Sequence, residues 1–230
     1  MRQLLEMNTF QLQNVYLKGL LEKAAAETVD RDVAERIQTV LTEELHHRAK
    51  NMLAMVTAIV RQSMRSTDSM AIAERAIGAR LMAMSSAHDL LLKANWKTTR
   101  LTAIIFGTVE HHVNCPGRIV VEGDQIEILA AAVVPLTLVL NELCTNATKY
   151  GALSEVGGHV SLTWTRDAKS ITFQWIESGG PLVAQPGRMS FGSRLIQDAL
   201  PRQLGGRGTL SFPASGVEYQ LIVPTKNLAA

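Results

Sequence analysis

Residues 140–151 read Leu-Asn-Glu-Leu-Cys-Thr-Asn-Ala-Thr-Lys-Tyr-Gly, and this stretch decides how the second half of the chain folds. With the apolar run before it, the stretch predicts a helix over 128–150 that has one strongly apolar side. Glu142, Asn146 and Lys149 are spaced by four and three residues, so they share one face of this helix. Because unpaired polar groups are costly to bury, this face requires a polar partner. Carboxamide oxygen suits Mg²⁺ and an ammonium suits phosphate, so a metal bound to phosphate would be such a partner.

Two segments downstream have the composition of ligand-binding turns. Glu177 ends a predicted strand just before Gly179 and Gly180. A carboxylate there can accept a hydrogen bond from an amino group such as that of adenine, and glycines let a backbone approach a ligand closely. Gly192 stands directly before a predicted helix, whose free N–H groups would bind phosphate while Arg194 adds donors. Each segment alone fits an ordinary turn or helix cap, but their order and spacing favour a nucleotide site.

The composition of the chain changes sharply near residue 97. Two of the sixteen glycines and no proline precede this point, whereas the other fourteen glycines and all seven prolines follow it. The change predicts an α+β fold with a helical segment over 1–35, a helical hairpin over 36–97 and an α/β domain over 98–230. A mixed sheet that helices cover on one face is expected in the last part. Its strands are predicted at 118–122, 159–165, 170–175, 208–212 and 218–223, and its helices at 101–115, 128–150 and 193–203.

Two apolar stripes predict the helical hairpin. Residues on each stripe recur at steps of four and three, and the polar segment 65–69 separates the stripes. The first stripe comprises Leu45, Ala49, Met52, Val56 and Ile59, and the second comprises Ile77, Leu81, Met84, His88 and Leu91. Two amphipathic helices joined by a short turn leave their apolar seam exposed, and two hairpins would bury it as a four-helix bundle. We therefore expect a homodimer through residues 36–97.

The face of the first hairpin helix that lies opposite its seam carries a histidine. At about 100° per residue, His47 lies about 200° from Leu45 and so points to solvent. Glu44, Lys50 and Asn51 lie three or four positions from His47 on the same face. A carboxylate, an imidazole, an ammonium and an amide would therefore meet on this surface.

This polar face suits a phosphoryl acceptor. The imidazole of His47 must be neutral to attack phosphorus, and the ordinary pKa of histidine allows this at cellular pH. Glu44 can hold or take the ring proton, while Lys50 or Arg48 can meet the incoming phosphate charge. A polar helix face is more often simply a solvated face, so periodicity alone does not establish the role. His46 lies beside the seam and is expected to pack at its edge.

The overall composition excludes several other classes of function. The net charge is +2 and charged residues make up 19%, which does not resemble a nucleic-acid footprint or a polybasic membrane patch. The apolar run 128–140 is too short to span a bilayer, and the N-terminus lacks the pattern of a secretory signal. Cys115 and Cys144 have no CxxC spacing and are expected to be free thiols of a cytoplasmic protein. Residues 1–35 are too few for a sensor domain, so a partner or a longer chain would supply the signal.

The order of these motifs resembles that of the HWE-type histidine kinases, over roughly residues 40–224. The phosphotransfer motif of that family, Glu-Leu-x-His-Arg-x-Lys-Asn, is met at 44–51, where His47 is the matching histidine. The Trp-x-Glu signature falls on residues 175–177. The last motif, Phe-Gly-Ser-Arg-Leu-Ile, is complete at 191–196.

The asparagine box of the family reads His-Glu-Leu-x-Thr-Asn-Ala-x-Lys-Tyr-Gly-Ala-Leu. This chain matches it over 142–153, but Asn141 replaces the histidine that gives the family its first letter. An amide keeps the ability to form hydrogen bonds and loses the titration of an imidazole. The replacement bears on a catalytic role of that side chain more than on nucleotide binding.

This resemblance implies a GHKL-type ATP-binding sandwich that binds ATP with Mg²⁺. ATP would donate its phosphoryl group to His47. The phosphoryl group would then pass to an aspartate of a response-regulator receiver domain. By resemblance Asn146 ligates Mg²⁺, with Glu142 and Lys149 beside the phosphates and Glu177 on the adenine side. The implied catalytic residues are His47, Glu44, Arg48, Lys50 and Asn51. The implied nucleotide-binding residues are Glu142, Asn146, Lys149, Tyr150, Glu177, Gly179, Gly180, Gly192, Ser193 and Arg194.

Three other functions fit part of the sequence. The first is a histidine phosphotransferase whose α/β part is a degenerate docking module that does not use ATP. The second is a GHKL-like ATPase or a serine-directed kinase, because the spacing of Glu142 and Asn146 also fits enzymes in which the acid activates water. That scheme gives the outward face of His47 no purpose. The third is a scaffold that uses its helices for assembly.

Overall fold

The computed structural model describes residues 36–230 with short gaps, which fall at 41, 44, 45, 48, 62, 66–68, 95, 111, 113–116, 186 and 188. Contacts divide the chain into one unit that ends at Thr57 and a second unit that spans Ala58–Ala230. In the first unit, every described residue from 36 to 57 is helical, and those up to residue 54 are exposed. Ile37, Val40 and Leu53 are apolar members of this exposed set. The four-helix bundle that would cover them stays a prediction.

The second unit begins with the last turns of this helix and continues into α2 (Met70–Lys93). The buried residues of α2 are Ala73, Arg80, Ala83, Met84, Ala87 and Leu91. The predicted stripe is therefore only partly right, because Ile77, Leu81 and His88 are half-buried. α2 packs against α4 (Ala130–Lys149), and Arg80 on α2 contacts Glu142 on α4. The ring of His88 instead lies 5.6 Å from that of Trp96, between ring centres.

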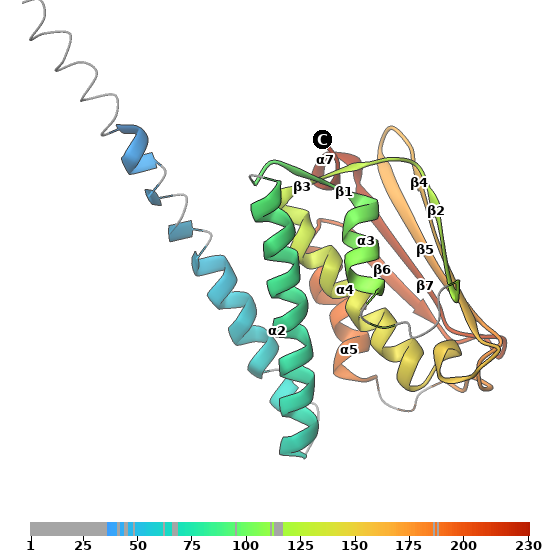
Figure 1. Ribbon diagram of the computed structural model, residues 1–230. Helices are drawn as coiled ribbons and strands as arrows, with labels where there is room; N and C mark the ends of the chain where they lie inside the picture. The colour runs from blue at the N-terminus through green and yellow to red at the C-terminus, as the bar shows by residue number, and fades with distance from the viewer. Residues whose placement is uncertain are drawn as a thin grey trace, which may run out of the picture. The chain divides into compact units, whose positions relative to one another are not determined.

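A five-stranded sheet forms the second layer of this unit, in the order β2-β4-β5-β7-β6. β2 and β4 are parallel and the other neighbours are antiparallel. The strands are β2 (Ile119–Gly123), β4 (His159–Arg166), β5 (Ser170–Ser178), β6 (Arg207–Ser211) and β7 (Glu218–Pro224). Buried residues alternate along β4, β5 and β7, so one face of the sheet packs against the helices (Figure 1). The predicted mixed sheet with helices on one face is confirmed.

The helices differ from the predictions mainly at their ends. The helix expected over 101–115 ends early as α3 (Leu101–Val109), and the one expected over 128–150 begins late as α4. The helix expected over 193–203 begins at residue 191 and contains a π-helical turn. Its segments are α5 (Phe191–Arg194), η2 (Leu195–Ala199) and α6 (Leu200–Gln203), and a short α7 (Thr225–Leu228) ends the chain. The hydroxyl of Tyr219 donates to the carbonyl of Ile196 at 2.7 Å, which satisfies a backbone group inside this irregular helix.

Two short strands were not expected from the sequence. β1 (Thr98–Arg100) is the next element after α2 and pairs antiparallel with β3 (Glu127–Leu129), which leads into α4. Ile128 also forms a bridge to Ala229, and the N–H of Ala230 donates to the carbonyl of Glu127 at 3.1 Å. Three-residue strands carry too few side chains for alternation to be recognised. The ladder joins the end of α2, the start of α4 and the C-terminal residues.

α4 is the central helix of the second unit. By length and composition it could cross a membrane, with a mean hydropathy of 1.3, but 78% of the window is buried inside the protein. Every residue from 132 to 144 is buried between the sheet and the other helices. A helix that is apolar on nearly all sides is the expected core of such a layered fold.

Leu138→Ala tests this assignment of the core. Leu138 is fully buried in α4, so its truncation should lower the free energy of unfolding by about 2–5 kcal/mol. Val156→Ala is the control, because Val156 is 98% exposed and its truncation should cost less than about 0.5 kcal/mol. Urea denaturation followed by circular dichroism measures both values. Equal losses in the two variants would contradict a core built around α4.

Candidate functional site

The three polar residues predicted to share one face of α4 lie in three different surroundings. Glu142 is buried and faces α2, Asn146 lines a cavity, and Lys149 is exposed in the last turn of the helix. Seven residues advance a helix by about 10 Å, so residues on one stripe meet different neighbours along its length. The prediction that this face needs a polar partner is right for Glu142, whose partner in this structure is Arg80. The cavity holds only Asn146 of the three.

The cavity is bounded by the C-terminal half of α4, the end of β5, and the segments around β6 and before α5. It encloses about 900 Å³, including space open to solvent at its mouth. The lining residues are Leu143, Asn146, Tyr150, Gly151, Glu177, Leu182, Val183, Ala184, Ser190, Ser193, Leu210, Phe212 and Val217. A mostly apolar wall with a few polar groups is typical of small-molecule sites.

Glu177 contributes a carboxylate to this cavity, and it is 3% exposed. One carboxylate oxygen accepts from the indole N–H of Trp175 at 3.1 Å, and the other accepts from the N–H of Ala152 at 2.8 Å. Trp175 and Glu177 are two residues apart on β5 and so project from the same face. Burial raises the pKa of Glu177, while these two hydrogen bonds lower it. Each oxygen keeps a second lone pair, so the carboxylate can still accept a hydrogen bond from an amino group of a ligand.

The glycines around this carboxylate are required by the packing of the protein itself. A side chain at Gly151 would meet the carboxylate of Glu177, and one at Gly180 would meet the Cα of Ala152 at 2.6 Å. Gly179 has a φ of 70°, which favours glycine. Gly179 and Gly180 were predicted to bring the backbone close to a ligand. The structure shows them close to the Ala152 and Gly157 backbone, because β5 ends against that loop, and their approach to a ligand stays a prediction.

Arg118 supports the same loop, and the sequence analysis did not identify this role. Its guanidinium donates to the carbonyls of Gly158 at 2.9 Å, of Leu153 at 3.2 Å and of Ala152 at 3.2 Å. It also donates to the carbonyl of Glu155. Arg118 therefore fixes the turn whose Ala152 N–H holds Glu177. No spacing signal could reveal this contact, because more than thirty residues separate the partners.

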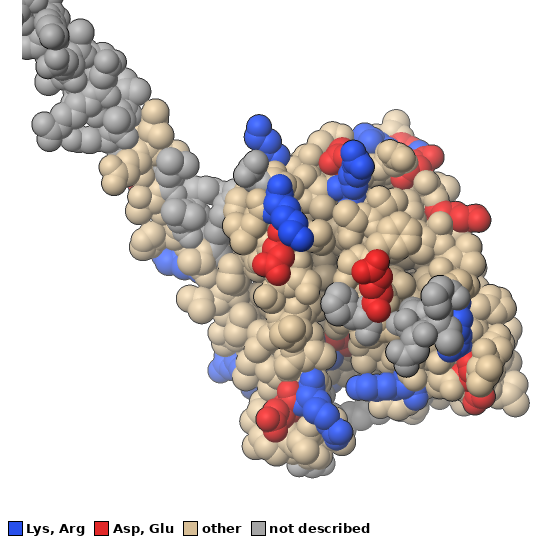
Figure 2. All heavy atoms as spheres, in the orientation of Figure 1, with Lys and Arg blue, Asp and Glu red and all other residues tan. Residues whose placement is uncertain are grey.

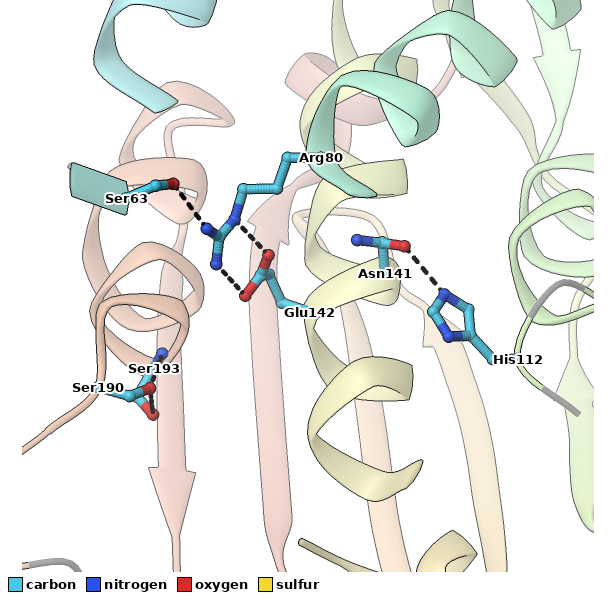
Figure 3. A network of polar contacts seen from close by, with 7 residues as sticks. All are labelled: Ser63, Arg80, His112, Asn141, Glu142, Ser190 and Ser193. Carbon is cyan, nitrogen blue, oxygen red and sulfur yellow. Dashed lines mark hydrogen bonds and ion pairs between the residues drawn. The ribbon is translucent and has the colours of Figure 1, made fainter. Parts of the chain in front are cut away.

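Ser190, just before α5, and Ser193, within α5, both line the cavity. The hydroxyl of Ser190 accepts from the backbone N–H of Ser193 at 3.1 Å and lies 2.9 Å from the Ser193 hydroxyl (Figure 3). Gly192 is buried, and a side chain there would meet the carboxylate of Glu142. Arg194 is exposed and does not line the cavity. Of the predicted phosphate-binding residues in this segment, only Ser193 reaches the cavity.

Asn141 lies on a different side of α4 from Asn146. Its amide oxygen is 2.9 Å from Nε2 of His112, and the side chain is buried (Figure 3). This contact joins the centre of α4 to the segment that follows α3. Asn141 therefore has a packing role, and its side chain is not part of the cavity wall.

The residues predicted to surround the reactive histidine belong to the first unit. His46, His47, Lys50 and Asn51 all lie on helical backbone and all are exposed. Because every described residue of this helix up to residue 54 is exposed, the exposure of His47 and His46 does not distinguish an outward face from a seam, and both assignments stay predictions. Glu44 and Arg48, like Leu45 of the seam, lie outside the described residues.

Charge and thiol chemistry add little to this site. Basic and acidic side chains are interspersed on the face that Figure 2 shows, without a gathering of one sign. Cys144 is a buried free thiol whose pKa burial raises to about 12, so it stays protonated at cellular pH. Cys115 lies outside the described residues.

Comparison with known proteins gives the following relatives. Residues 44–125 match the family model described as HWE histidine kinase. The blue-light-activated histidine kinases of Brucella ovis and Brucella abortus are each 35% identical over 217 residues, which is 92% of this chain and 44% of theirs. The corresponding kinase of Brucella anthropi is 33% identical over 218 residues, or 90% of this chain and 44% of its own. The chain thus spans less than half the length of these curated relatives.

Solved structures show a similar fold. The histidine kinase domain of the Erythrobacter litoralis blue-light-activated histidine kinase has a TM-score of 0.55 at 16% identity and covers 76% of this chain and 96% of that one. A longer structure of the same kinase has a TM-score of 0.59 at 18% identity and covers 79% and 57% of the two chains. At these identities the likeness concerns the fold alone.

The raised pKa of Glu177 predicts a pH dependence of stability. An acid whose pKa is higher in the folded than in the unfolded protein holds its proton more tightly when folded, so its contribution to stability falls as pH rises above its ordinary value of 4.5. The free energy of unfolding of the wild type minus that of Glu177→Gln should therefore fall as the pH rises from 4.5 toward neutrality. Trp175→Phe removes a hydrogen bond that lowers the pKa of Glu177. In that background, the Glu177 contribution to the free energy of unfolding should fall by a larger amount as pH rises. Urea denaturation at several pH values measures it, and a difference that rose with pH would contradict the prediction.

Proposed function

Since this chain belongs to the HWE histidine kinase family, we propose that it phosphorylates His47 from ATP and passes the phosphoryl group to an aspartate of a response-regulator receiver domain. The observation that carries the proposal is that Asn146, Glu177 and Ser193 line one cavity. The fold around this cavity is similar to that of a histidine kinase domain. These relatives are histidine kinases, and activation by blue light is a property of those proteins. The activity of the whole protein is part of the proposal.

The lining residues fit a magnesium nucleotide. Glu177 would accept from the adenine amino group, the apolar wall would cover the base, and Ser193 would lie toward the phosphates. Asn146 offers the carboxamide oxygen that Mg²⁺ accepts. Among the described residues no group of three or more His, Cys, Asp or Glu could hold a metal, so Mg²⁺ would take its other ligands from phosphate and water. Lys149 and Arg194 are exposed and would act from the rim.

The reaction assigns a simple role to each residue of the histidine face. The neutral imidazole of His47 attacks the γ-phosphorus, the bond to the leaving ADP oxygen breaks, and a ring proton leaves to a base such as Glu44. Lys50 and Arg48 would offset the phosphate charge, and Asn51 would complete the polar face. Most of the rate gain in such transfers comes from positioning and charge neutralisation.

The proposed partners follow from the exposed surfaces and the chain length. A homodimer through residues 36–97 would cover Ile37, Val40 and Leu53, which are exposed in the single chain. The curated relatives are more than twice as long as the matched region, so the sensor would lie on further sequence or on a separate protein. The receiver domain would be a cytoplasmic protein, and we place this kinase in the same compartment.

Incubation with γ-labelled ATP tests the phosphoacceptor. Wild-type protein should gain acid-labile phosphate at His47, and His47→Ala should lose it because no other nucleophile replaces the imidazole. His46→Ala is the matched control and should keep most of the label. Label lost from His46→Ala but kept in His47→Ala would show that the other histidine reacts. Acid-stable phosphate would support a serine-directed kinase, and phosphate accepted from a receiver without ATP binding would support a phosphotransferase.

Asn146→Ala tests the nucleotide site. Loss of the carboxamide should weaken Mg²⁺-dependent ATP binding by about tenfold or more, because a contact with a charged partner is removed. Isothermal titration with and without Mg²⁺ measures the effect. Binding that is unchanged in both conditions would place the metal elsewhere.

A further inference from the structure

A buried arginine connects the helical part of the second unit to the cavity wall. The guanidinium of Arg80 on α2 donates from Nε and Nη2 to the two carboxylate oxygens of Glu142 on α4, at 2.7 and 2.8 Å. Its Nη1 donates to the hydroxyl of Ser63 at 2.8 Å, and its centre lies 4.6 Å from the middle of the Phe191 ring. Figure 3 shows Arg80 between Ser63 and Glu142. Arg80 is 7% exposed and Glu142 is 4% exposed. Four segments of the chain meet at one cation.

This cluster adjoins the cavity at two points. Glu142 lies one helical turn before Asn146 on α4. Gly192 packs against the Glu142 carboxylate and leads directly to Ser193, which lines the cavity with Asn146. Arg80 and Glu142 thus form the outer support of the wall on which both lining residues stand.

Stability alone does not explain a buried ion pair in this position. Removing two charges from water costs about as much as their attraction returns, and apolar residues of similar volume are often equally good. The pair does fix geometry, because the planar guanidinium matches the two carboxylate oxygens in one orientation and stacks on the ring of Phe191. Lysine could not make the same set of contacts.

The completeness of the contacts also argues against a latch that opens in each turnover. Removing one partner of a buried pair shifts the folding equilibrium by about a hundredfold or more, because the other charge stays buried without a counter-ion. A movement that separates Arg80 from Glu142 would meet a comparable cost. A permanent positioning contact is therefore the better interpretation of this geometry.

We propose that Arg80 is a positioning residue of the ATP site, which holds Glu142 and the Phe191–Ser193 turn in place from α2. The inference rests on the proposed function, since it concerns the part of the cavity that would receive the phosphates. It adds that the helix following the phosphoacceptor helix sets the geometry of the nucleotide site. Glu142 then acts through Arg80 and Gly192 and does not touch the nucleotide itself.

A double-mutant cycle separates positioning from simple stability. Arg80→Met, Glu142→Gln and the double variant are compared with Arg75→Met, which makes the same change on α2 at an exposed site. Each single variant should raise the ATP concentration for half-maximal labelling of His47 by about tenfold or more, since small displacements of positioning groups have large effects. The double variant leaves no buried charge, so it should regain stability to urea but keep the raised KM for ATP. Arg80→Lys should not rescue KM.

The outcomes distinguish this inference from the proposed function. A double variant that regains both stability and the KM of Arg75→Met would show that the pair is only structural and would overturn the inference. If the wild type binds ATP but does not label His47, the proposed function fails. The inference is then decided by ATP affinity from titration, and equal affinities of Arg80→Met and Arg75→Met would sink it. A wild type that binds no ATP would overturn both.

Discussion

The burial of α4 is the constraint on which the rest of the second unit depends. Between residues 132 and 144 no side of the helix faces water, so each polar side chain must find a partner within the protein. Thr137 donates to the carbonyl of Val133, Asn141 meets His112, and Glu142 meets Arg80. The contacts of Asn141 and Glu142 fix the rotation and height of the helix against its neighbours. Beyond the buried stretch, Asn146 emerges at the cavity with its place already determined.

The buried carboxylate of Glu177 also needs hydrogen-bond partners within the protein. A buried acid is costly when charged, and two donors from Trp175 and Ala152 offset part of that cost. The donor from Ala152 depends on a turn that Arg118 ties together through backbone carbonyls. The acid therefore stands in a fixed orientation before any ligand arrives, and such preorganisation is what a specific hydrogen bond to a ligand needs.

Sequence reasoning found the elements whose signal is local. The alternation along β4 and β5 and the long apolar run of α4 can be recognised in the sequence, because the polarity of each residue indicates whether its side chain is buried. The motif residues Asn146, Tyr150, Glu177 and Ser193 were named in advance and do line one cavity. That agreement concerns their placement, and their roles as ligands remain proposals.

What the sequence did not show depends on contacts between distant segments. An arginine on an otherwise apolar face of α2 is a recognisable signal of a buried pair, but Glu142 as its partner requires the packing of α2 on α4. The sequence did not reveal which backbone approaches the glycines after Glu177, and their assignment to a ligand stays a prediction. Arg118 had no signal, since its acceptors are carbonyl groups that every residue carries.

A change in the tilt of α2 relative to the β1–β3 ladder would move Arg80 in proportion to its distance from the ladder. The hydrogen bonds of this ladder and the C-terminal residues link the segment that follows α2 to the start of α4. Arg80 lies thirteen residues before the last residue of α2, which is about 20 Å along the helix axis. If α2 tilted by only about 3° about its C-terminal end, the guanidinium of Arg80 would move by about 1 Å. That is a large displacement for a group that forms two parallel hydrogen bonds with a carboxylate. Small angular changes delivered to α2 from the preceding helix would thus be magnified where the turn before Ser193 is anchored.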